Sequence, residues 1–172
     1  MNNIAKKPQR TDLNEYNWQE FYEEVQNESP RAAVIISGAF LDNLLRDLIA
    51  SFMINNKKIV DELLGTEQIC EAPLSSFGAR IKTAYCLRLI DKLEYEDLKL
   101  IQKIRNRFAH KMHGYSFQDP EIIKWCNLFQ SQNNPALLKF KKTHGDNFLL
   151  TVSGLVNRIG LQILSLHNGS RM

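Results

Sequence analysis

The sequence predicts an all-α fold, a single-domain bundle of about six or seven helices. Two observations lead to this prediction. Apolar side chains recur every three or four residues through most of the chain, which is the period of a helix that buries one face. No pair of alternating apolar and polar segments, as in neighbouring strands, is evident. We expect the bundle to span residues 15–168, behind a polar N-terminal tail over residues 1–14.

The first half of the chain predicts a short helix, a long core helix and a second short helix. Apolar residues mark the first helix from Trp18 to Val25. Ser29-Pro30 is a typical helix start, with serine as the N-cap and proline at the first helical position. The long helix that follows runs to about Phe52, and its apolar stripe is Ile36, Phe40, Leu44, Leu48 and Phe52. The third helix ends at Gly65.

The second half of the chain predicts four more helices. We expect them at residues 74–89, 94–111, 121–129 and 148–166. The turn at Asp91 to Leu93 separates the first two, and Asp119-Pro120 opens the third. A short segment around Leu137 and a basic patch lie before the last helix.

Composition suits one folded domain in a reducing compartment. The 172 residues are 44% apolar and 24% charged, as in globular proteins and not in disordered ones. The net charge of +3 neither demands nor excludes nucleic acid. Three widely spaced cysteines, Cys70, Cys86 and Cys126, indicate neither a disulfide framework nor a metal knuckle. We therefore expect a cytoplasmic protein.

Neither the N-terminal segment nor the most apolar run predicts contact with a membrane. The first eight residues lack the apolar core of a secretory signal. The most apolar run, from Ala32 to Ile54, carries Asp42, Arg46 and Asp47 at its centre. Charges at that place make a membrane span improbable.

The segment from Arg105 to His110 is the richest in chemistry. An arginine binds phosphate through a planar fork of donors, and a histidine transfers protons near neutral pH. Asn106 lies one turn before His110, where its amide could orient the imidazole ring. In an ideal helix, however, Arg105 and His110 are about 140° apart around the axis. They could share one phosphate if the helix loosens near Gly114 or if a second subunit supplies the complementary group.

This segment resembles the Arg-x4-His signature of the HEPN superfamily of all-α proteins. The resemblance implies a homodimer whose paired motifs face one cleft, and a metal-independent endoribonuclease of a toxin or defence system. Cleavage would proceed by attack of the RNA 2′-hydroxyl on the neighbouring phosphate. His110 would then act as general base or acid, Arg105 would stabilise charge on phosphoryl oxygens, and Asn106 would hold the imidazole or the phosphate.

A longer stretch, from about Arg31 to Phe129, resembles the mannitol operon repressor (MtlR) family. The matching landmarks are Arg31–Ile36 leading into Phe40–Leu45, then Leu74–Lys82, Glu94–Leu98 and Arg105–His110. This resemblance implies a bacterial regulatory protein that acts by binding RNA or a protein partner, such as an antitoxin. We take this as the first reading of function, and the endoribonuclease as its alternative.

Asp42 is a second candidate residue, with two readings. Arg46 lies four positions further along the long helix, so an ion pair within that helix is the simpler explanation. The carboxylate could instead bind Arg105 or His110 and hold that side chain in position for the phosphate. Likewise, the polar residues of the Arg105–His110 segment could simply pair with Asp42 or Glu96 and cap the helix.

Basic residues predict where nucleic acid phosphates would bind. Candidates are Arg107, Lys111, Lys139, Lys141 and Lys142. Direct DNA binding is not expected, because no segment shows the two short helices of a helix-turn-helix. His113 follows His110 by three residues, but no carboxylate or cysteine stands at ligand spacing. We therefore expect neither a metal nor a cofactor.

A third reading makes the chain a plain helical interaction module. Trp18, Trp125 and the long helix would then form a dimer interface or a docking face.

Overall fold

The computed structural model describes residues 18–66, 68–69, 71–110, 115–130 and 143–168. Within these ranges the structure has seven helices and no strand, which confirms the all-α prediction. The helices are α1 (Trp18–Val25), α2 (Pro30–Phe52), α3 (Lys57–Leu64), α4 (Phe77–Cys86), α5 (Lys92–His110), α6 (Pro120–Cys126) and α8 (His144–His167).

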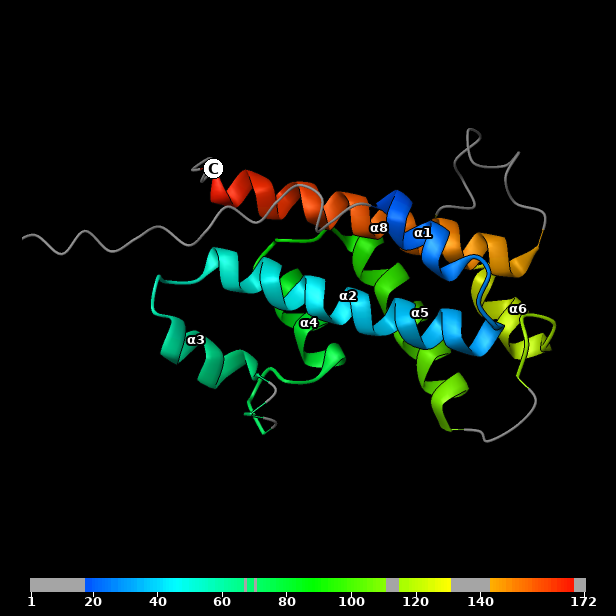
Figure 1. The fold of residues 1–172 in the computed structure, drawn as a ribbon, viewed down its shortest axis with the longest axis horizontal. Helices are drawn as coiled ribbons and strands as arrows, with labels where there is room; N and C mark the ends of the chain where they lie inside the picture. Colours follow the sequence, from blue (N-terminus) through cyan, green and yellow to red (C-terminus); the bar gives the residue numbers. More distant parts are fainter. Residues whose placement is uncertain (1–17, 67, 70, 111–114, 131–142, 169–172) are drawn as a thin grey trace, which may run out of the picture.

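Two long helices, α2 and α8, form the axis of the bundle. They run side by side along the long dimension of the molecule (Figure 1) and pack against each other more extensively than any other pair. The helix α1 lies on both of them, whereas α4 and α5 pack against α2 and against each other. The helix α6 contacts α5 and α8, and α3 packs on α2. Every described helix thus touches α2 or α8.

The core is one continuous apolar cluster. The stripes of α2, α5 and α8 meet in it, through residues such as Leu41, Leu45, Ile101, Val156 and Ile159. Aromatic rings close one end, where Phe117 lies 5.8 Å from Phe108 and 5.5 Å from Phe148, measured between ring centroids. Full burial of each large apolar side chain stabilises the fold by about 1.5–3 kcal/mol.

Side chains that cap helices explain where the observed helix starts differ from the predicted ones. Ser29 accepts the backbone N–H of Ala32, as predicted. The last helix begins at His144 instead of Phe148, because Thr143 and Asp146 form a capping box. Ser76 accepts the N–H of Ala79, so α4 begins at Phe77 instead of Leu74.

Three further predicted boundaries were wrong. The helix predicted from Glu94 begins at Lys92, because the Asp91 carboxylate accepts the Glu94 N–H at 2.8 Å and the Glu94 carboxylate accepts the Asp91 N–H at 2.7 Å. The helix α4 ends at Cys86, before a left-handed residue, Arg88, with φ of 57°. Likewise, α6 ends at Cys126 and not at Phe129.

Two large side chains near helix ends lie at the surface, and one of them, Phe52, belongs to the predicted stripe of α2. Phe52 is 47% exposed, because it is the last residue of α2, where the helix runs beyond its main contacts. Tyr85 is 39% exposed and stacks on Tyr95, with 4.6 Å between ring centroids. A regular apolar stripe therefore overestimates burial at helix ends.

The helix α8 is the described segment whose length and composition would also fit a membrane span. Half of its most apolar stretch is buried inside the structure. Val152, Val156, Ile159 and Ile163 are fully buried there, and α8 packs against α1, α2, α5 and α6. Its apolar composition is that of a core helix.

Candidate functional site

The helices α2 and α5 meet at a glycine, and the stem of Arg105 lies on it. Gly38 is buried, and a β-carbon at this position would stand 2.7 Å from Cγ of Arg105. Glycine within a helix costs roughly 0.5–1 kcal/mol relative to alanine. Here it makes room for the aliphatic part of Arg105 against the backbone of α2.

The guanidinium of Arg105 binds its neighbour in sequence. Its Nη1 donates to Oδ1 of Asn106 at 3.1 Å. The Asn106 oxygen therefore faces the arginine instead of orienting the ring of His110. The helix α5 remains regular through His110, which is exposed. A regular helix keeps Arg105 and His110 about 140° apart around its axis, and residues 112–114 lie outside the described residues.

Asp42 does not pair with Arg46, so the simpler of its two predicted readings was wrong. Nη1 of Arg80, on α4, lies 2.7 Å from Oδ1 of Asp42. Arg46 instead binds Asp61 on α3, at 2.7 Å, because its side chain points toward that helix. Long-range packing of α3 and α4 on α2 has replaced the expected i, i+4 pair.

Arg80 is the centre of this region. It is buried, and its other nitrogens donate to two backbone carbonyls, those of Leu74 at 2.9 Å and Leu64 at 2.8 Å. Burial raises the pKa of Asp42, while the charge of Arg80, its hydrogen bond and the charge of Arg105 lower it. Arg105 is thus near enough to act on the Asp42 carboxylate electrostatically.

Basic residues on α5 pack onto aromatic rings. Arg107 forms an ion pair with Glu121 at 2.7 Å and lies over Tyr115, 5.2 Å from the ring centroid. Lys103 covers Trp125 at 4.4 Å. Trp125 is buried, so it cannot form the docking face considered above. The other predicted phosphate-binding residues, Lys111, Lys139, Lys141 and Lys142, and the predicted segment around residue 137 lie outside the described residues, and so does the side chain of Trp18.

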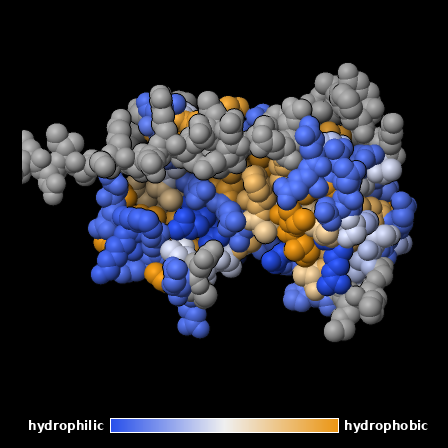
Figure 2. Space-filling model, viewed as in Figure 1, coloured by the Kyte–Doolittle hydropathy of each residue, from blue (hydrophilic) through white to orange (hydrophobic). Residues whose placement is uncertain are grey.

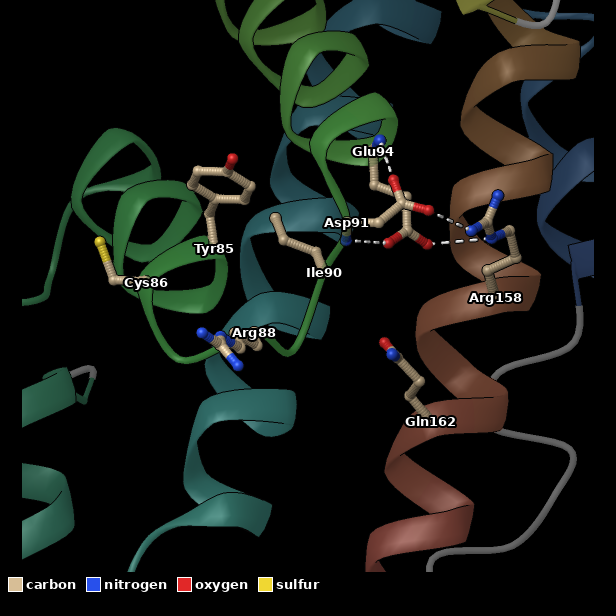
Figure 3. A pocket seen from close by; sticks show the side chains of 8 residues that line it. All are labelled: Tyr85, Cys86, Arg88, Ile90, Asp91, Glu94, Arg158 and Gln162. Atoms are coloured by element: carbon tan, nitrogen blue, oxygen red, sulfur yellow. Dashed lines mark hydrogen bonds and ion pairs between the residues drawn. The ribbon is translucent and has the colours of Figure 1, made fainter. Parts of the chain in front are cut away.

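A second candidate site escaped the sequence reasoning. It is an open hollow of about 550 Å³ between the α4–α5 turn and α8 (Figure 3). Its lining consists of Tyr85, Cys86, Arg88, Ile90, Asp91, Glu94, Arg158 and Gln162. Asp91 and Arg158 are 67 positions apart, and no local motif joins them. Within the described residues, no three histidine, cysteine or acidic side chains gather as metal ligands would.

An ion cluster forms one side of this hollow. Arg158 donates from Nη2 to Asp91 and from Nε to Glu94, both at 2.9 Å. Burial raises the pKa of the Glu94 carboxyl. Burial also acts to raise the pKa of Asp91, but the Glu94 N–H and Arg158 hold it below its usual range. The cluster ties the start of α5 to α8.

A buried carboxyl, Asp97, lies one turn further along α5. Its Oδ1 accepts the backbone N–H of Gln130 at 2.9 Å. Burial raises the pKa of Asp97 to about 6, although that hydrogen bond lowers it. No sequence signal marks this buried carboxyl, because Asp97 stands between Glu96 and Leu98 in an ordinary amphipathic pattern.

Comparison with known proteins finds one matching family and similar proteins in Escherichia coli. A family described as "Mannitol repressor" matches residues 18–160. Mannitol operon repressors of Escherichia coli strains K12 and CFT073 are 36% identical over 53 residues, 31% of this chain. The matched region spans 27% of the length of these relatives.

A solved structure shows the same fold. A chain in the X-ray structure of the MtlR–HPr complex from Escherichia coli matches with a TM-score of 0.67 and 21% identity, over 83% of this chain and 98% of that chain. The family match covers all seven described helices in full or in large part, including the Gly38–Arg105 contact and the Asp42–Arg80 pair. The chain belongs to the mannitol repressor (MtlR) family.

Proposed function

We propose that this chain is a cytoplasmic regulatory protein that acts by binding a protein partner. The main support is the family match over residues 18–160, together with the fold shared with a chain of the MtlR–HPr complex. HPr is therefore the first partner to test. Direct contact with DNA forms no part of this proposal.

The geometry of the Arg105–His110 segment favours recognition over catalysis within one chain. A general base and a phosphate-binding group must reach the same few ångströms of space. The regular course of α5 through His110 directs these two side chains to different sides of the helix. The Arg105 stem is fixed on Gly38, and its head is bound to Asn106. A fixed polar surface of this kind suits a partner of complementary shape.

An apolar band supplies the other element of a protein-binding surface. Figure 2 shows hydrophobic side chains gathered over the middle of one face, along α2, with hydrophilic side chains on both sides. On α2, Ile35 and Ile36 are partly exposed and Ala39 is exposed. Protein interfaces combine such an apolar centre with a polar rim.

Calorimetric titration of the full chain with Escherichia coli HPr tests the proposal. We expect a saturable complex that Ile35→Asp weakens by about tenfold or more, since a charge would be desolvated in the apolar contact. Ile59→Asp is the matched control, because Ile59 is half exposed on α3 and lies outside the α2 band. Absence of binding to HPr by calorimetry and by co-elution would count against this partner.

A second candidate is RNA cleavage by a homodimer. Its support is the resemblance of Arg105–His110 to the Arg-x4-His signature, and because these two side chains lie on different sides of α5, a second subunit would supply the complementary group. Labelled single-stranded RNA would be incubated with the wild type, Arg105→Ala and His110→Ala in the presence of a chelator, after circular dichroism shows all three folded. Cleavage lost in both variants supports the ribonuclease. Equal cleavage by all three assigns it to a contaminant.

A further inference from the structure

We propose that the outward side of the second half of α5 binds single-stranded RNA through its phosphodiester backbone. Four basic residues lie on this side, which we call the basic face: Lys99, Lys103, Arg107 and His110. Lys99 is partly exposed, and the other three are exposed. Binding at the basic face needs neither a protein partner nor cleavage of the RNA. This inference therefore stands apart from both functions proposed above, and either can fail without the other.

The spacing of the basic face matches that of a nucleic acid strand. Consecutive residues of an α-helix are about 100° apart around the axis and about 1.5 Å apart along it. The four basic positions therefore fall within an arc of about 80° and extend over about 16 Å. Lys99, Lys103 and Arg107 follow one another at intervals of four residues, or about 6 Å. Successive phosphates of a nucleic acid strand are separated by a similar distance, so one strand can pair several phosphates with this face.

The charge of the basic face is not balanced within α5. All acidic residues of this helix precede it, namely Glu94, Glu96 and Asp97. Among the described residues, one ion pair reaches the basic face, between Arg107 and Glu121 of α6 at 2.7 Å. Like charges four residues apart destabilise a helix, and the helix dipole favours cations only in the last turn. Lys99 and Lys103 are therefore unfavourable for α5 alone, and a bound polyanion would remove their repulsion.

Two cations of the basic face are held in place by aromatic rings. Lys103 lies over Trp125 of α6, with its Nζ atom 4.4 Å from the ring centroid. Arg107 lies over Tyr115, at 5.2 Å from the ring centroid. A side chain that is already ordered loses less conformational entropy when a ligand binds. These two charges are therefore prepared for a phosphate before the strand arrives.

The composition of the basic face favours RNA over a protein or a membrane. Protein interfaces have an apolar centre in which lysine is depleted, and helices that lie on membranes bury an apolar side. Among the described residues, no exposed large apolar side chain lies between Lys99 and His110. Asn106 is partly exposed beside the basic cations, and because its oxygen accepts from Arg105, its N–H groups remain for an acceptor. The ribose 2′-hydroxyl is such an acceptor, and DNA lacks it.

Fluorescence anisotropy of a labelled oligouridylate of about twelve nucleotides, titrated with the full chain, tests the proposal. Each phosphate of a single strand that a cation neutralises contributes about −0.7 to the slope of log K against log salt concentration. We expect a slope of about −2 to −3 for three or four such contacts. The double variant Lys99→Gln/Lys103→Gln should weaken binding by about tenfold at about 50 mM salt and reduce the slope by about 1.4. A gel of the probe after the titration separates binding from cleavage.

A matched control removes the same charge elsewhere. Lys57→Gln/Lys58→Gln on α3 changes two exposed lysines outside the basic face and should leave the affinity within about twofold of the wild type. Circular dichroism establishes that both double variants are folded. We expect RNA to bind about threefold or more tightly than oligodeoxyuridylate or a polyglutamate peptide of the same length. The proposal is overturned if RNA does not bind, if the two double variants weaken binding equally, or if either of these other polyanions binds as tightly as RNA.

Discussion

The buried carboxyl of Asp97 should lower the stability of the protein at neutral pH. Its pKa is raised from 3.8 to about 6. Each pKa unit corresponds to 1.36 kcal/mol, so the difference of about 2.2 units amounts to about 3 kcal/mol. A carboxyl whose folded pKa is raised stabilises the fold fully below its unfolded pKa, and that stability is lost as the pH rises through the folded value. We therefore expect the loss between about pH 4 and pH 6.

Asp97→Asn tests this reasoning. Asparagine resembles the neutral acid, and its amide oxygen can still accept the Gln130 N–H. The variant should raise the free energy of unfolding at pH 7 by up to about 3 kcal/mol. The variant should also lack the part of the pH dependence that Asp97 causes, which is the fall in the free energy of unfolding between pH 4 and pH 6.

Urea unfolding followed by circular dichroism, repeated from pH 4 to pH 8, measures both effects. The difference between variant and wild type isolates Asp97, because Asp42 and Glu94 also have raised pKa values in both proteins. Glu62→Gln on α3 is a matched control, since Glu62 is exposed and its stability difference should be near zero. A variant less stable than the wild type at pH 7, with the wild-type slope intact, would refute the reasoning.

Three further substitutions test the packing of the fold, each by urea unfolding at pH 7. Gly38→Ala should destabilise the protein by about 1–3 kcal/mol, since the new β-carbon would overlap the Arg105 stem. Gly154→Ala is the control and should not destabilise it, because the space at Gly154 is open. Equal effects of the two substitutions would contradict this reasoning. Arg80→Met should cost about 3–5 kcal/mol by leaving Asp42 and two carbonyls without their donor, and a cost below 1 kcal/mol would disprove the role. Thr143→Ala should cost about 1 kcal/mol through loss of the α8 cap, with Thr143→Ser as the variant that retains it.

Local sequence signals predicted the fold well. The Ser29-Pro30 start is confirmed, and so is the burial of Leu44 and Leu48 in the predicted stripe of α2, because both predictions depend on neighbours within about four positions. Helix ends were less accurate, since residues such as Thr143 and Asp91 extend the helices beyond their apolar stripes. The same limit explains Phe52, where the stripe continues but the packing ends.

The candidate sites depend on contacts that a sequence does not display. Spacing favoured Arg46 as the partner of Asp42, but the actual partner, Arg80, is 38 positions away. The hollow joins the α4–α5 turn to α8 through side chains that have no common motif. The Arg105–His110 segment was recognised from its residue types, but the place of Arg105 on Gly38 follows only from the crossing of α2 and α5.

The hydrogen bonds and the ion pair of Arg80 determine which segments of the protein unfold together in a local opening. One guanidinium holds the carbonyl that ends α3, the carbonyl that precedes α4, and a carboxylate on α2. The connection over residues 65–73 is therefore closed at both ends by the same group. Amide hydrogens in α3 should exchange with solvent together with those of this connection, as one cooperative unit. Opening that unit would expose Arg80 while α2, α5 and α8 stay folded.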